Sequence, residues 1–267
     1  MTKYNIIGDI HGRDCWKDLV DPSRINIFLG DYMDPYDYYS YEELKNNFLD
    51  IMSFAKNYPE TILLLGNHDL HYIHGKDNSR MDMKHKQDIL DLFLDNIHLF
   101  HGVAYAIGND ILVSHAGFTC EWMMNVGYTG DGSLLSYEQY ANMLLWKGYH
   151  EDDDGKRWFD LKDCGLKEFT FQAYAKFSDY YGTSPGQSPV WIRPETLEYW
   201  SMDINKDQVV GHTQSPRIII DNAVHFRDED KIGTGRLIVC DCLGYVTESL
   251  YIDYNGFGDY IYKINKK

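Results

Sequence analysis

The sequence predicts an α/β fold in which two β-sheets form a sandwich flanked by helices. Two observations support this prediction. Short continuous apolar runs recur along the chain, and such runs are typical of strands that are buried on both faces. Segments with helical features separate the first runs, whereas the last part of the chain is again rich in strands.

The first half of the chain alternates between predicted strands and helices. Glu42 and Glu43 mark the start of one helix, because acidic side chains in the first turn complement the helix dipole. Apolar residues at helical spacing between Ile89 and Leu94 indicate another. The predicted order is a strand at about 3–8, a helix at 13–20, a strand at 25–30, a helix at 41–57, a strand at 61–65 and a helix at 82–95.

The second half begins with predicted strands near 97–100, 103–107 and 111–115, the last two joined by a hairpin turn at Gly108-Asn109-Asp110. Residues 119–200 are expected to be mostly helical and irregular. We interpret them as a lid or cap inserted into a single domain that spans 1–267. From 208 onward the chain is strand-rich again, most clearly at 237–240 and 245–251.

Composition restricts the classes of partner. The chain has 267 residues, of which 44% are hydrophobic, so one domain with a sizeable core is the simplest expectation. The formal net charge of −16 makes a nucleic-acid polymer an unfavourable partner. It also disfavours a bare anionic substrate, unless metal ions and local arginines reverse the field at the site.

Cysteine usage and the N-terminus predict a cytoplasmic protein. The five cysteines are scattered and odd in number, which favours reduced thiols. Cys240 and Cys242 are expected to serve packing. No signal peptide precedes the first strand, and no apolar run is long enough to cross a membrane. The sequence leaves the oligomeric state open.

The most informative segment is Asp9-Ile10-His11, which follows an apolar run and lies between two glycines. Side chains two residues apart on an extended chain point to the same face, so a carboxylate and an imidazole are directed toward one place. Four later apolar runs also end in clusters of Gly, Asp, Asn and His. Because open α/β sheets place their sites at the carboxyl ends of strands, these ends predict one shared metal site. The later clusters are GDYMD from Gly30, GNHD from Gly66, SHAG from Ser114 and GHT from Gly211.

Taken in order, these motifs resemble those of the calcineurin-like metallophosphoesterases. Within that superfamily they are most similar to the bacterial and phage relatives of the phosphoprotein phosphatases. The motifs span positions 8–213, which is most of the chain. The resemblance implies a four-layer αββα domain that hydrolyses phosphoesters with two divalent metal ions.

The resemblance also implies which residues bind the metals. Their carboxylate, imidazole and amide atoms suit borderline divalent ions, with Mn²⁺ expected first and Fe²⁺ or Zn²⁺ as alternatives. Two ions about 3.5–4 Å apart can share a hydroxide that attacks phosphorus in line. The implied ligands are Asp9 and His11 for the first ion, Asp31 as the bridge, and Asn67, His115 and His212 for the second.

His68 is the expected proton donor to the leaving oxygen, and Asp34 is expected to hold its ring and fix its tautomer. Asp69 could orient His11 or cap the following helix, and capping is the preferred interpretation. His71 and His74 continue a three-residue spacing from His68. A packed or solvated helix turn explains that spacing better than a further zinc site.

The chain departs from the phosphatase pattern after the second motif. Those phosphatases carry an arginine directly after the aspartate that corresponds to Asp34, whereas this chain has Pro35-Tyr36. Arginine is the natural bidentate partner of a phosphate. The candidates to replace it are Arg193 in a Trp-x-Arg segment, Arg80 after the third motif, and Arg13 after the first.

The leading functional hypothesis is therefore a phosphatase that acts on phosphomonoesters, whether phosphoprotein, nucleotide or small metabolite. A dinucleoside polyphosphate hydrolase is the first alternative. A phosphodiesterase is the second, because the acidic chain fits a polymer poorly. A non-catalytic binding module on the same fold ranks last, because every expected ligand and the expected proton donor are present.

Overall fold

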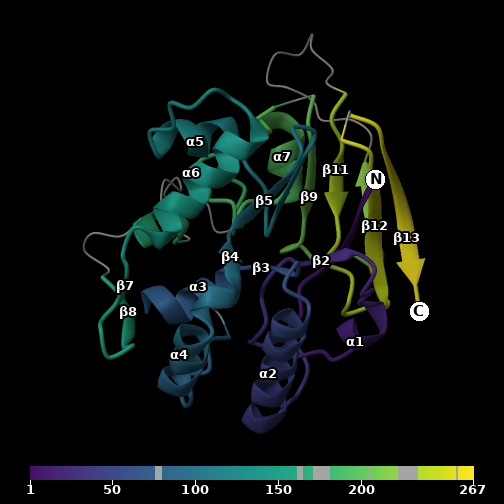
Figure 1. The fold of residues 1–267 in the computed structure, drawn as a ribbon. Helices are drawn as coiled ribbons and strands as arrows, with labels where there is room; N and C mark the ends of the chain where they lie inside the picture. The colour runs from purple at the N-terminus through teal and green to yellow at the C-terminus, as the bar shows by residue number, and fades with distance from the viewer. Residues whose placement is uncertain (76–79, 161–164, 171–180, 204, 222–233, 257) are drawn as a thin grey trace.

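Two β-sheets form the centre of the computed structural model, which describes all residues except 76–79, 161–164, 171–180, 204, 222–233 and 257 (Figure 1). The larger sheet has the order β13-β12-β1-β2-β3-β4, in which β1 to β4 run parallel to one another and β12 is antiparallel to both of its neighbours. Its strands are β1 (Thr2–Ile7), β2 (Ile25–Phe28), β3 (Ile62–Leu64), β4 (Phe100–Gly102), β12 (Glu248–Tyr254) and β13 (Tyr260–Lys266).

The second sheet has the order β10-β11-β9-β6-β5. Its three central strands are parallel, and an antiparallel strand lies at each edge. The expected hairpin at 108–110 joins two of these strands, with Ile107 paired to Ile111. The strands are β5 (Ala104–Ile107), β6 (Ile111–Ser114), β9 (Asp207–Val210), β10 (Ile219–Asp221) and β11 (Leu237–Val239).

Helices cover both outer faces of the sandwich (Figure 1). The longest is α2 (Tyr41–Asn57), which begins with a capping box between Ser40 and Glu43. The other helices are α1 (Trp16–Leu19), α3 (Asn67–His74), α4 (Lys86–Asp95), α5 (Cys120–Asn125), α6 (Leu134–Trp146) and α7 (Pro194–Trp200), with 3₁₀ turns at Ile97–Leu99 and Gly165–Phe169.

The alternation of side chains along the strands builds the layers. Ile6 of β1 belongs to the core between the two sheets, together with Val209 of β9. The next residue on β1, Ile7, belongs instead to the core that contains Phe48 of α2. Successive residues of a strand point to opposite faces, so each of these strands supplies two cores at once. The predicted α/β fold with two sheets flanked by helices is confirmed.

Several predicted boundaries were wrong, including that of the helix expected at 13–20, which forms only at Trp16–Leu19, and three others moved because of a local turn. Residues 97–99 form a 3₁₀ turn, and the strand expected there begins only at Phe100. The helix expected from 82 begins at Lys86, because the Asp82 side chain accepts hydrogen bonds from the backbone of Lys84 and His85. The strand expected from 245 begins at Glu248, after a turn that follows Cys242.

The segment 119–200, expected to be a helical cap, contains α5, α6 and α7, and residues 161–164 and 171–180 lie outside its described part. It also contains a small antiparallel sheet of β7 (Tyr149–Glu151) and β8 (Arg157–Phe159), which the sequence did not indicate. Helix α6 buries Ala141 and Leu145 in the same core as Leu112 of β6. This part of the segment therefore forms an outer layer of the sandwich.

Two expectations from composition can be compared with the described residues. Cys240 and Cys242 are buried and unpaired, as expected of packing residues. Cys15 is also free, whereas Cys164 lies outside the described residues. Among the described helices, none is both long and apolar enough to cross a membrane.

Candidate metal centre

The carboxyl ends of strands from both sheets bring the expected ligands together. Asp9 follows β1, Asp31 follows β2 and Asn67 follows β3 in the larger sheet. His115 and His212 follow β6 and β9 in the second sheet. All of these side chains are buried, as is His11. The site therefore lies where the ends of the two sheets meet.

Asp9, His11 and Asp31 form the first group, with one potential ligand atom of each within 4.8 Å of the others. His11 Nδ1 lies 3.0 Å from the carbonyl oxygen of Asp34 and 3.2 Å from that of Met33, so Nδ1 carries the proton. This leaves Nε2 free as an acceptor, 3.5 Å from Asp31 Oδ2. A backbone partner that fixes the tautomer in this way is typical of metal-binding histidines.

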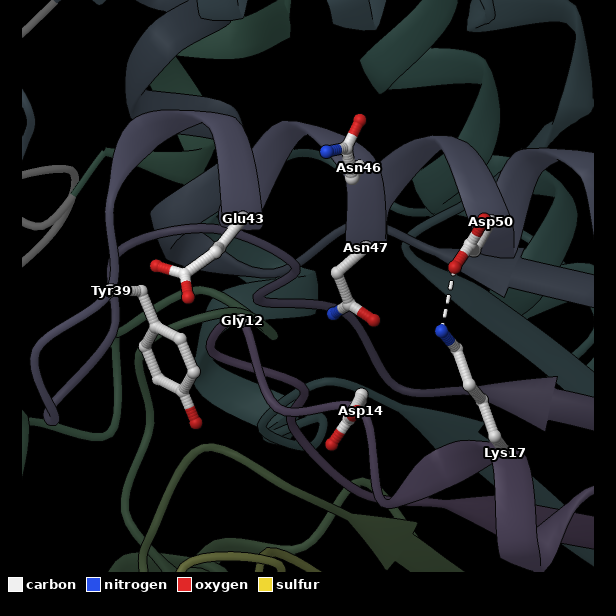
Figure 2. Close-up of a pocket in the computed structure, with 8 residues that line it drawn as sticks. All are labelled: Gly12, Asp14, Lys17, Tyr39, Glu43, Asn46, Asn47 and Asp50. Atoms are coloured by element: carbon white, nitrogen blue, oxygen red, sulfur yellow. Dashed lines mark hydrogen bonds and ion pairs between the residues drawn. The ribbon is translucent and has the colours of Figure 1, made fainter.

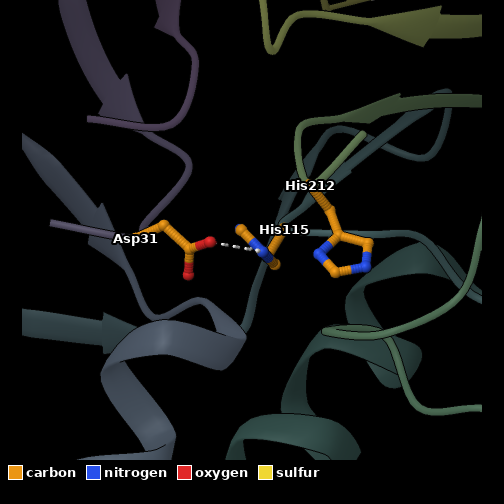
Figure 3. Close-up of side chains that lie close together, drawn as sticks. All are labelled: Asp31, His115 and His212. Carbon is orange, nitrogen blue, oxygen red and sulfur yellow. Dashed lines mark ion pairs between the residues drawn. The ribbon is translucent and has the colours of Figure 1, made fainter. Parts of the chain in front are cut away.

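Asp31, His115 and His212 form the second group at the same spacing (Figure 3). His115 donates its Nδ1 proton to the carbonyl oxygen of Leu29 at 2.8 Å, so its Nε2 is an acceptor. The Asn67 side-chain oxygen lies 2.9 Å from His115 Nε2 and 2.9 Å from His212 Nδ1. Asp31 thus belongs to both groups, as a bridging carboxylate would.

The donor set fits a divalent cation. His115 Nε2 faces both the Asn67 oxygen and, at 3.5 Å, Asp31 Oδ2, and all three atoms are hydrogen-bond acceptors. The buried atoms Asp9 Oδ1 and His212 Nε2 have no hydrogen-bond partner. Buried acceptors that face one another are unfavourable unless a positive charge lies between them. Two divalent ions would supply that charge.

Electrostatics of the site also favour cations. Burial and the nearby Asp241 and Asp31 carboxylates raise the pKa of Asp9 well above its usual range. Burial lowers the pKa of His11 to about 3, which keeps the ring neutral and able to bind a metal. Burial opposes ionisation of Asp31, but the surrounding histidines lower its pKa below the usual value. Its carboxylate is therefore ionised.

Backbone strain is concentrated at this site. Among the described residues, five that are not glycine have a positive φ: His11, Asp31, Asp34, Arg80 and His212. Such conformations cost free energy and persist where the surrounding structure fixes them, which is common at functional sites. All five were candidate site residues from the sequence, so the strain marks the same place independently.

Glycine is required where the backbone approaches the ligands. A Cβ atom on Gly66 would lie 2.2 Å from Asp31 Oδ1 and 2.7 Å from the His115 ring. A Cβ atom on Gly211 would lie 2.1 Å from Asp9 Oδ1. All three contacts are shorter than van der Waals distance, so only glycine lets the strand ends approach so closely.

Asp69 caps α3 and does not contact His11, so the preferred interpretation is confirmed. Its Oδ2 accepts hydrogen bonds from the backbone of Gly66 and Asp31, both at 2.8 Å. Its Oδ1 accepts one from the backbone of Tyr32 at 2.9 Å. One buried carboxylate therefore joins the start of α3 to the loop that carries Asp31.

His68 and Asp34 are in contact, as expected. His68 Nδ1 donates to Asp34 Oδ2 at 2.9 Å, which fixes the ring. Asp34 also contacts His71 Nε2 at 2.6 Å and accepts a hydrogen bond from the Tyr72 hydroxyl. Burial opposes ionisation of Asp34, but the two histidines lower its pKa. The Asp34, His68 and His71 atoms also have metal-ligand spacing. Because these donors already surround the carboxylate, we interpret the group as a hydrogen-bond network.

The three candidate arginines occupy different positions. Arg80 is the one that contacts His68, with a guanidinium nitrogen 2.8 Å from His68 Nε2. Arg193 lies beside His212 but donates to its backbone oxygen and to Thr213. Arg13 is buried, and its guanidinium carbon lies 5.8 Å from the centre of the Tyr36 ring. Of the three, Arg80 is therefore the one placed against the expected proton donor.

A separate polar pocket of about 280 Å³ adjoins the turn after His11 (Figure 2). Asp14, Glu43 and Asp50 line it, whereas Lys17 is its only lining cation and is paired with Asp50 at 2.6 Å. The excess of acidic groups makes this pocket unfavourable for an anion. This pocket is therefore a poor candidate for a phosphate site.

The structure adds residues that the sequence interpretation missed. Asp241 is 1% exposed, and neither of its carboxylate oxygens has a hydrogen-bond partner. Burial, followed by the Asp31 charge, raises the pKa of Asp241 to about 7. The available signal was the apolar run 237–240, which ends in this aspartate as the other runs end in ligands. Tyr72 gave no such signal.

The fold and the buried acidic and imidazole groups together define a metal-dependent enzyme class with its site where the ends of two sheets meet. Comparison with known proteins gives the family: the calcineurin-like phosphoesterase family model matches residues 2–216. The chain belongs to this family, so hydrolysis of phosphoesters with divalent metals is its supported chemistry. A search of curated proteins found no match.

Metal removal should destabilise the protein. An ion present at 100 times its dissociation constant stabilises the fold by about 2.7 kcal/mol, or roughly 5–10 °C in melting temperature for a chain of this size. Thermal unfolding with Mn²⁺ and with a chelator measures this difference. Equal melting temperatures would contradict metal binding.

The difference in melting temperature between the protein with Mn²⁺ and the protein with a chelator should also increase with pH. Without metal, the stabilisation from protonated Asp241 is complete below its unfolded pKa of about 3.9 and is lost as the pH rises through about 7. A bound cation offsets the cost of burying the ionised Asp241 carboxylate. Protons also compete less with the metal for its ligands at higher pH. The difference in melting temperature should therefore be larger at about pH 8 than at about pH 5.5. A difference that becomes smaller over this pH range would contradict the argument that a bound cation offsets the buried Asp241 charge.

Proposed function

We propose that the protein is a phosphatase that hydrolyses phosphomonoesters with two divalent ions, preferably Mn²⁺. The observation that carries this proposal is the sharing of Asp31 by two buried ligand groups. In this proposal Asp9, His11 and Asp31 hold one ion, and Asp31, Asn67, His115 and His212 hold the other. When bound, two such ions activate water near neutral pH and neutralise the charge of the phosphate.

The protein's own side chains would supply the remaining steps. His68 Nδ1 donates to Asp34, so Nε2 is the atom that would carry a proton to the leaving oxygen. In the structure without substrate, Arg80 donates a hydrogen bond to His68 Nε2. A phosphate beside His68 would take the guanidinium as its partner, leaving Nε2 to hold the proton. Asp34 then stabilises the resulting imidazolium.

Two features support a phosphomonoester over a polymer. The chain carries a net charge of −16, which repels a polyanion. Few arginines are candidates for binding the phosphate, and of these Arg80 lies directly beside His68. The segment 119–200, part of which lies outside the described residues, is our proposed determinant of substrate choice.

A substrate panel tests the proposal. Metal-free protein is supplied with Mn²⁺ and assayed on p-nitrophenyl phosphate, phosphopeptides, nucleotides and sugar phosphates. Bis-p-nitrophenyl phosphate and a dinucleoside tetraphosphate represent the alternatives. We expect the highest kcat/KM among the monoesters. A preference for either alternative would overturn the monoester assignment, and metal uptake without any hydrolysis would favour a binding module.

A further inference from the structure

Tyr36 directly follows Pro35, which stands where the phosphatases that this chain resembles carry arginine. Its ring lies against the metal site, in an edge contact with the His11 ring at a centroid distance of 4.8 Å. The guanidinium carbon of Arg80 lies 3.5 Å from the centre of the Tyr36 ring. That of Arg13 lies 5.8 Å from it. An aromatic ring therefore lies close to two arginines that come from other segments.

The contact with Arg80 has the geometry of a cation over an aromatic face, which attracts a guanidinium electrostatically and by stacking. Arg80 adopts a positive φ of 70°, a conformation that arginine rarely adopts unless its surroundings hold it. Its guanidinium also reaches His68 Nε2 at 2.8 Å. The ring and the histidine thus fix a long, otherwise flexible side chain beside the expected proton donor.

We propose that Tyr36 is a positioning residue that holds Arg80, with Arg13 nearby, as the binding site for the phosphate of the substrate. In this arrangement the ring replaces the missing arginine by organising arginines from elsewhere in the chain. The inference rests on the proposed function, because it concerns the phosphate of the same site. It predicts that the aromatic ring matters more than its hydroxyl group.

Three variants separate the possible roles of Tyr36. Tyr36→Phe keeps the ring and removes the hydroxyl, whereas Tyr36→Leu keeps much of the apolar volume and removes the aromatic face. Tyr38→Leu is the matched control, because Tyr38 is a neighbouring tyrosine that is 97% exposed. Calorimetric titration of each metal-loaded protein with inorganic phosphate measures binding without turnover. Metal content is measured on the same samples.

We expect Tyr36→Leu to weaken phosphate binding by about five- to tenfold, while Tyr36→Phe and Tyr38→Leu stay within about twofold of the wild type. Metal content should not change. On p-nitrophenyl phosphate, Tyr36→Leu should raise KM more than it lowers kcat. Arg80→Ala should weaken phosphate binding as well, and adding Tyr36→Leu to it should cause little further loss, because the ring acts through Arg80.

Other outcomes would overturn the inference. Equal losses in Tyr36→Phe and Tyr36→Leu would assign the role to the hydroxyl group. Loss of metal in Tyr36→Leu would show that the ring acts through His11. Fully additive effects of Tyr36→Leu and Arg80→Ala would show that the two residues act separately. If the wild type binds phosphate in this pattern but hydrolyses no ester, the proposed function fails while the inference about Tyr36 stands.

Discussion

Replacing His68 with alanine is expected to lower kcat on alkyl phosphates by about 10²–10⁴-fold while both metals stay bound. The alkoxide that leaves from such substrates needs a proton, and His68 is the buried histidine whose ring Asp34 holds in place. p-Nitrophenolate leaves without a proton, so the loss on p-nitrophenyl phosphate should be less than about tenfold. Steady-state kinetics on the two substrates measure the difference.

His98→Ala is the matched control for this experiment, because His98 is exposed and lies in a 3₁₀ turn away from the candidate site. Its activity should equal that of the wild type on both substrates. An equal loss on the two substrates in His68→Ala would contradict a role in proton donation. It would assign His68 to substrate binding or to the metal site. Metal analysis of the variant separates these two outcomes.

Asp31→Asn should have the largest effect of any single substitution. The Asp31 side chain is shared by both ligand groups, and its Oδ1 also accepts a hydrogen bond from the His68 backbone at 2.9 Å. Asparagine keeps an oxygen for that hydrogen bond but loses the charge and the second oxygen that a bridge requires. We expect at most one bound ion and a loss in kcat/KM of at least about 10³-fold, or ~4 kcal/mol.

Metal analysis and kinetics of Asp31→Asn are compared with Asp18→Asn, an exposed aspartate outside the site. The control should bind two ions and keep full activity. Far-ultraviolet circular dichroism checks that both variants fold. Two tightly bound ions in Asp31→Asn would show that the aspartate does not bridge, and the dinuclear arrangement would have to be abandoned.

The expected ligands were accessible to sequence reasoning because the pattern that marks them is local. Asp9 and His11 lie two residues apart at a strand end, and Asn67 and His68 directly follow another buried run. A buried strand that ends in a glycine and a polar cluster can be recognised within about ten residues. The same locality explains why the start of α2 at Tyr41 was predicted correctly.

Contacts between distant loops were not accessible in the same way. Asp241 influences Asp9 across the chain, and no property of either segment predicts the other. His71 was interpreted as part of a helix turn, but only the folded chain brings it to 2.6 Å from Asp34. The sequence ranked Arg193 ahead of Arg80, whereas the structure places Arg80 against His68.

The sequence by itself determined the two-sheet fold class, the family resemblance and the positions of the expected ligands. These depend on periodicity, strand ends and short-range spacing, which are properties of neighbouring residues. The tertiary structure alone decided the sheet order, the burial of Asp241 and the contact of Tyr36 with Arg80. Such features depend on which strands pair and where long side chains from separate loops meet. Those contacts are set by packing of the whole domain, which no local pattern encodes.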